Sequence, residues 1–159
     1  KKPKQPKIKK QKTEEILDLK GSYVDVARKY LFRKEIKVLI LINKILPKEF
    51  IVFPKVGADL ILTPIGKSTL YQTIRGKYID LVIFEEETMK PKLAIDLFDG
   101  TIGDEQMNIE CPEVVKALES AGLPILSVKV KTEYSESELK EPIYKALSIK
   151  ERSEKLESA

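Results

Sequence analysis

Apolar residues recur along residues 24–46 at the spacing of a helix. The members of this face lie four, three, four and three positions apart: Leu31, Glu35, Val38, Ile42 and Ile45. Such steps return to one side of a helix, and Pro47 ends it because proline cannot continue the hydrogen-bonding pattern. The sequence therefore predicts a helix with one carboxylate, Glu35, on its inward stripe. That glutamate either keeps its head in water at the edge of the face or takes part in a site.

Three apolar stretches with the composition of strands follow, and two of them contain an aspartate. They are residues 49–56 (EFIVFPKV), 77–87 (KYIDLVIFEEE) and 93–98 (LAIDLF). Pro54 indicates that the first strand lies at an edge or bends, and the short connection between the other two predicts a hairpin. Asp80 and Asp96 then stand on neighbouring strands. A buried, ionised carboxylate is costly unless it is paired or binds a metal, so both aspartates are candidates for chemistry.

Between the first two strands the pattern is weaker. Residues 58–64 form an apolar piece of uncertain type, and residues 65–76 (IGKSTLYQTIRG) are expected to be a polar loop. The GKST in this loop lacks the earlier glycine that a phosphate-binding loop requires, because Ile61 stands at that place. A nucleotide-binding loop is therefore rejected.

The last third of the chain predicts a strand–helix–strand crossover followed by a closing helix. Residues 111–122 (CPEVVKALESAG) predict a helix with Pro112 near its first turn and Gly122 as its stop. Residues 123–131 predict a strand, and residues 135–158 a helix with a break near Pro142. A hairpin followed by such a crossover predicts one α/β domain with a mixed sheet flanked by helices.

The composition limits which catalytic groups and metal ligands the chain can use and in which compartment we expect it. The 159 residues suit one domain with a sizeable core, and no apolar run reaches the ~18 residues that span a membrane. The absence of histidine excludes Ser-His and Cys-His nucleophiles and His-ligated zinc. Any metal site must therefore use carboxylate and carbonyl oxygens, which suit magnesium, manganese or calcium. The single cysteine, Cys111, cannot form an internal disulfide, so we expect a cytoplasmic protein.

The positive charge is concentrated at the start of the chain. Seven of the 29 basic side chains lie in residues 1–12, so 22 remain against 25 acidic ones in the rest. We expect a disordered basic tail over residues 1–12, a domain over 13–151 and a polar tail over 152–159. The first residue is not methionine and the last ones are polar, so we also expect a piece of a longer protein.

The carboxylates predict a divalent-cation site. If Asp80 and Asp96 lie on the same face of paired strands, they approach closely and repel unless a cation lies between them. Glu35 could supply a third ligand, and Mg²⁺ or Mn²⁺ keeping several waters would be the occupant. The alternative is structural: Asp80 caps the strand or pairs with Arg75 or Lys77, and Asp96 pairs with a lysine on the next helix.

Several segments together resemble a known family. They are RKEIKVLILINKILPKEFIVFPKVGADLIL, RGKYIDLVIF, LAIDLFDG and PEVVKALESAGLPILSVKV, within residues 31–131. Their order resembles the PD-(D/E)XK nuclease-like superfamily, and more closely its bacterial branch known as domain of unknown function 2726. The resemblance implies a restriction-endonuclease-like fold with a mixed β-sheet flanked by helices.

The resemblance also implies a role for each matching residue. Asp80 and Asp96 match the two metal-binding acids, and Glu35 matches the glutamate on the first helix. Lys116 matches a lysine on the helix after the second acid. The chain departs from this pattern in two ways. Phe98 stands where the superfamily has a lysine on the strand. The branch usually has an acid at that same place, but the nearest acid here, Asp99, lies one residue later and would point inward only if the strand bulged.

Two functions remain open. The first is a Mg²⁺- or Mn²⁺-dependent DNA phosphodiesterase with a degenerate active site, in which Lys116 neutralises charge and the tail of residues 1–12 holds the nucleic acid. The second is an inactive module on the same fold that binds nucleic acid or a protein partner. In that case the lysine-rich tail could also face an anionic membrane beside an anchor in a longer protein. The oligomeric state is not predicted.

Overall fold

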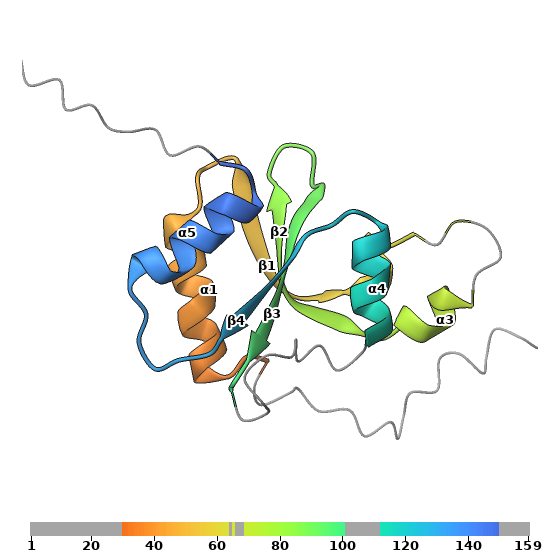
Figure 1. Ribbon diagram of the computed structural model, residues 1–159, viewed down its shortest axis with the longest axis horizontal. Helices are drawn as coiled ribbons and strands as arrows, with labels where there is room; N and C mark the ends of the chain where they lie inside the picture. Colours follow the sequence, from red (N-terminus) through yellow and green to blue (C-terminus); the bar gives the residue numbers. More distant parts are fainter. Residues whose placement is uncertain (1–29, 64, 66–68, 101–111, 150–159) are drawn as a thin grey trace, which may run out of the picture. The chain divides into compact units, whose positions relative to one another are not determined.

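Four strands and five helices make up the part of the chain that the computed structural model describes, which is residues 30–63, 65, 69–100 and 112–149. The strands form one sheet in the order β1-β2-β3-β4, as Figure 1 shows. Their bounds are β1 (Phe50–Gly57), β2 (Tyr78–Glu85), β3 (Pro91–Phe98) and β4 (Ile125–Lys129). The helices are α1 (Arg33–Ile45), α2 (Ala58–Ile61), α3 (Leu70–Ile74), α4 (Pro112–Ser120) and α5 (Glu136–Ala146). The small α/β domain with a mixed sheet is confirmed, and both predicted tails lie outside the described residues.

The sheet combines a meander with a crossover. β1 pairs with β2 and β2 with β3 in antiparallel fashion, whereas β3 and β4 are parallel. The predicted hairpin of β2 and β3 and the crossover through α4 are therefore confirmed. Pro54 lies in β1, an edge strand that pairs with another strand on one side only. A proline is tolerated there because the outer side of the strand needs no N–H donor.

Helices cover both faces of the sheet. α1 and α5 lie on one face, and α4 lies with α3 on the other (Figure 1). Along β2, Leu81 and Ile83 are buried in the core beneath α1 and α5, while Val82 and Phe84 are buried in the second core with α4. Burial on both faces explains why this strand is almost continuously apolar rather than alternating.

The core face of α1 is the one that the spacing predicts. Val38, Ile42 and Ile45 are buried, and Ile40 on the outer side is 63% exposed. The helix begins later than expected, at Arg33 rather than near residue 24, and residues 24–29 lie outside the described part. No helix within the described ranges is both long and apolar enough to cross a membrane.

Two expectations about local structure are wrong. The segment expected to be a polar loop contains α3, which forms because Ile74 is fully buried against the core that includes α4. The closing helix does not break at Pro142, since α5 continues through it and ends at Ala146. Leu139 and Ile143 on either side of the proline are both buried, so tertiary packing holds the helix together.

The chain leaves α4 as predicted. Gly122 has φ +70°, a left-handed conformation that glycine adopts without steric cost. The Leu123 N–H donates to the Leu118 carbonyl at 3.0 Å, and the Gly122 N–H donates to the Glu119 carbonyl at the same distance. These bonds satisfy carbonyls at the end of the helix and direct the chain into β4.

Replacing Ile42 by alanine should lower the free energy of unfolding by about 2–5 kcal/mol, because it leaves a cavity under α1. Ile40→Ala on the same helix is the matched control and should change it by less than about 0.5 kcal/mol. Urea unfolding followed by circular dichroism measures both. Equal losses in the two variants would contradict the assignment of the core face.

Candidate functional site

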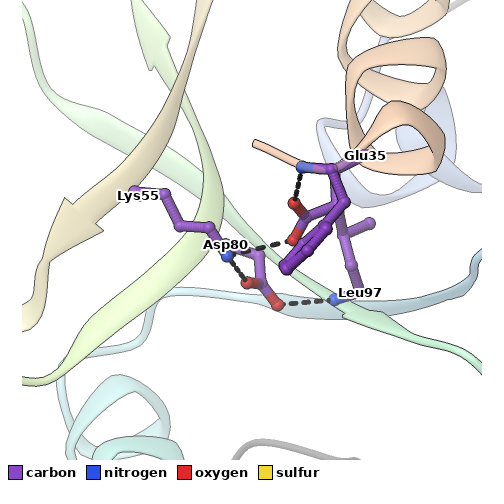
Figure 2. Close-up of polar contacts among 5 residues, drawn as sticks. Glu35, Lys55, Asp80 and Leu97 are labelled. Carbon is purple, nitrogen blue, oxygen red and sulfur yellow. Dashed lines mark hydrogen bonds and ion pairs between the residues drawn. The ribbon is translucent and has the colours of Figure 1, made fainter. Parts of the chain in front are cut away.

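A lysine on the edge strand joins two of the predicted acids. The register pairs Pro54 with Leu81 and Val56 with Ile79, which places Lys55 opposite Asp80. The Lys55 Nζ lies 2.8 Å from Asp80 Oδ1 and 3.1 Å from Glu35 Oε1. Figure 2 shows the ammonium group between the two carboxylates, which come from different elements. We call these three residues the Lys55 cluster.

The backbone at Lys55 is strained. Its φ of 52° lies in the left-handed region, which costs a lysine about 1–2 kcal/mol because its Cβ crowds the carbonyl oxygen. Such strain persists only where the surroundings over-determine the conformation. The contacts of Lys55 with two carboxylates are part of those surroundings.

Asp80 also holds the sheet together. The pairing of β2 with β3 reaches Leu81 and Ile95 at this end. Just beyond, Asp80 Oδ2 accepts a hydrogen bond from the Leu97 N–H at 2.9 Å, as Figure 2 shows. The side chain of Asp80 thus satisfies a backbone donor of β3 with one oxygen and binds Lys55 with the other.

Glu35 is held in the same way by the start of α1. Its Oε2 accepts a hydrogen bond from the backbone N–H of Phe32 at 2.7 Å, which satisfies a free donor at the helix terminus. Its Oε1 faces Lys55. The stem lies on the predicted inward stripe, and the carboxylate is engaged at both oxygens rather than free in water.

The electrostatics of the Lys55 cluster favour the charged lysine. Only 15–17% of each of the three side chains is exposed, which weakens screening by water. Burial lowers the pKa of Lys55, but hydrogen bonds and charge from Asp80 and Glu35 outweigh it, so the pKa rises from its ordinary 10.5. The ammonium also lies 4.6 Å from the centre of the Tyr78 ring, a cation–π contact.

The carboxylate oxygens of the Lys55 cluster are of the ligand type that a hard divalent cation takes. Two carboxylate oxygens from α1 and β2 point at one cation, and Mg²⁺ or Mn²⁺ takes such a pair together with several waters. The ammonium of Lys55 lies at that point, so a metal would have to displace it. In the described ranges no three acidic or cysteine side chains lie close enough together to hold a metal.

Asp96 is buried on β3, directly before Leu97, whose N–H donates to Asp80. Asp96 is 4% exposed and lies between Ile95 and Leu97, which pack into the core beneath α1. Alternation along the strand then directs Asp96 toward the α4 side, as it does Ala94. Its register partner on β4 is Ser127, whose buried hydroxyl has no hydrogen-bond partner among the described residues.

The remaining sequence candidates are exposed. Lys116 is exposed on α4, the helix on the opposite face of the sheet from α1. Asp99 is exposed just after β3. Asp80 has Lys55 as its cationic partner rather than Arg75 or Lys77, the two partners that the alternative interpretation named.

Lys55 was not predicted from the sequence. The available signal was a charged residue inside the apolar run FIVFPKV, directly after a proline. This signal did not reveal which groups Lys55 contacts, because Glu35 and Asp80 lie 20 and 25 positions away along the chain. Only the pairing of β1 with β2 brings the lysine to them.

Comparison with known proteins gives one match. A family model described as "Protein of unknown function (DUF2726)" matches residues 27–147, most of the chain. No curated protein and no solved structure matches significantly. The matched range contains Glu35, Lys55 and Asp80 as well as Asp96 and Lys116.

Replacing Lys55 by methionine should lower the free energy of unfolding at pH 7 by about 1–2 kcal/mol, because it leaves two half-buried carboxylates without their cation. Since the pKa of Lys55 is raised in the folded state, its contribution is complete below pH 10.5 and is lost as the pH rises through the folded pKa. The difference in urea unfolding between parent and variant should therefore shrink above that pH. Lys131→Met, which removes an equally short but exposed ion pair with Glu138, is the control and should change little.

Proposed function

The chain belongs to the family of proteins of unknown function DUF2726, and we propose that this member is a metal-dependent, nuclease-like domain that hydrolyses phosphodiester bonds of nucleic acid. The proposal includes a restriction-endonuclease-like variant of the mixed sheet. Its active site is the Lys55 cluster, at the end where β2 and β3 separate.

One observation carries the proposal: two carboxylates from distant segments converge on a single cation. Converging, partly buried carboxylates are the usual means of holding Mg²⁺ or Mn²⁺ beside a phosphate. A cation held there would activate water and offset negative charge on the phosphate. Glu35 and Asp80 would hold it, because their inner oxygens already face one point.

The residues of the chain would then divide the work. Asp80 is oriented by the Leu97 N–H and Glu35 by the Phe32 N–H, so neither carboxylate has to be ordered when a cation arrives. Lys55, once released, would lie next to the substrate and could donate to a phosphate oxygen. It would thereby supply the positive charge that the superfamily takes from the strand position of Phe98. Asp96 and Lys116 remain candidates for a further ligand and a more distant charge.

The same contact favours a second candidate, an inactive module that binds nucleic acid or a protein partner. In the Lys55 cluster one ammonium already pairs with both carboxylates and offsets part of their negative charge. The lysines of residues 1–12 would bind polyanions without sequence preference, either nucleic acid or an anionic membrane. The two candidates differ in whether acids of the cluster bind a metal and support cleavage.

Supercoiled plasmid incubated with Mn²⁺ should be nicked by the parent protein and at least about 100-fold more slowly by Asp80→Asn, which loses a ligand charge but little volume. Glu86→Gln, at an exposed position of the turn between β2 and β3, is the matched control and should cleave like the parent. Cleavage by Asp80→Asn at the parental rate would refute the assignment.

Calorimetry with Mn²⁺ at neutral pH tests the metal separately from the chemistry. Binding should be lost in Asp80→Asn and should become about tenfold tighter in Lys55→Met, because the competing ammonium is gone. Asp96→Asn measures whether that buried acid contributes. No heat with either the parent or Lys55→Met would leave the inactive module as the better description.

A further inference from the structure

Two exposed aromatic residues flank the Lys55 cluster. Phe32 is 69% and Tyr78 is 53% exposed. The Phe32 N–H donates to Glu35, and the Tyr78 ring lies 4.6 Å from the Lys55 ammonium. The backbone of Phe32, just before α1, and the ring of Tyr78, at the start of β2, thus each contact a member of the cluster. Neither ring is needed to fill the core.

Each aromatic residue is accompanied by two exposed basic residues. Arg33 and Lys34 follow Phe32, and Arg75 and Lys77 precede Tyr78. The segments FRK and RGKY therefore each bring a ring and two cations next to the Lys55 cluster. Gly76 has φ +75° and a Cβ there would meet nothing within 4 Å, so the turn between the two cations is open to solvent.

From this arrangement we propose that the site takes single-stranded nucleic acid, with unpaired bases stacked on Phe32 and Tyr78 and phosphates near the four basic side chains. The inference rests on the proposed function of the same site and specifies its substrate class. Base–aromatic stacking tolerates any sequence, because every base has a π-face, and it adds to the attraction of a positively charged surface.

Duplex DNA fits this surface less well. In a duplex the faces of the bases are occupied by neighbouring bases, and only their edges are accessible in the grooves. Exposed rings gain no stacking partner there, whereas the basic side chains contact phosphates of either form. The rings should therefore discriminate between single and double strands, and the cations should not.

Lys55 gives Tyr78 a defined position in this scheme. Its ammonium is attracted to the ring while it is held by Asp80 and Glu35, so the ring is tied to the charged centre. A base stacked on Tyr78 would thus place its own phosphodiester close to the carboxylates.

Fluorescence anisotropy with a labelled oligothymidine of about 16 nucleotides, compared with a duplex of equal length, tests the inference on the full chain. Mg²⁺ and Mn²⁺ are removed with EDTA so that binding is measured without cleavage. The parent should bind the single strand more tightly than the duplex. Phe32→Ala and Tyr78→Ala should each weaken single-strand binding about tenfold and leave duplex binding nearly unchanged.

Conservative variants separate stacking from damage to the fold. Tyr78→Phe and Phe32→Tyr keep a ring and should bind like the parent. Met89→Ala removes another exposed apolar side chain, in the turn at the far end of β2, and should also bind like the parent. Equal affinity for duplex and single strand, or alanine variants that bind the single strand like the parent, would overturn the inference.

Failure of the single-strand inference can be told apart from failure of the proposed hydrolase function. Ring-dependent single-strand binding without cleavage in Mn²⁺ would support the stacking surface and refute the hydrolase. Cleavage that depends on Asp80 but not on either ring would support the hydrolase and refute the stacking surface.

Discussion

The ion pairs of Lys55 with Glu35 and Asp80 are the interaction on which the candidate site of this domain depends. They join α1, β1 and β2, and through the hydrogen bond from Leu97 they reach β3. Because water reaches these side chains only in part, the attraction is less screened than in the exposed pairs of the molecule, such as Lys131 with Glu138. The interaction also compensates the strain of a lysine held at positive φ.

The same interaction defines and restricts the candidate site. Two acids from different segments are oriented by backbone N–H groups before any ligand arrives, and this pre-organisation suits cation binding. An internal ammonium occupies the point at which they converge, so any divalent cation must compete with it. The aromatic and basic residues around the site give it a surface that a single strand could use. Structure and candidate chemistry therefore depend on one lysine, and the proposals differ in what happens when it leaves.

Most of the fold could be predicted from the sequence because each element has a periodic local signal. The spacing of Val38, Ile42 and Ile45 predicted the core face of α1, and Pro112 and Gly122 marked the region of α4. Prediction failed where packing overrides local preference. α3 has too few turns for a visible period and is anchored through Ile74, and α5 continues through Pro142 because buried residues hold it on both sides.

For the site, the residue types along the chain limit which chemistry it can offer. With no histidine and with acids inside apolar segments, the sequence pointed to carboxylates, and it named Glu35 and Asp80 among them. Which groups meet depends on the folded arrangement. It brought Lys55 to both acids, buried Asp96 on β3 and left Lys116 exposed on α4. Residue type and spacing are properties of the chain, whereas contact between distant residues depends on strand register and on the side to which each backbone turn directs its side chain.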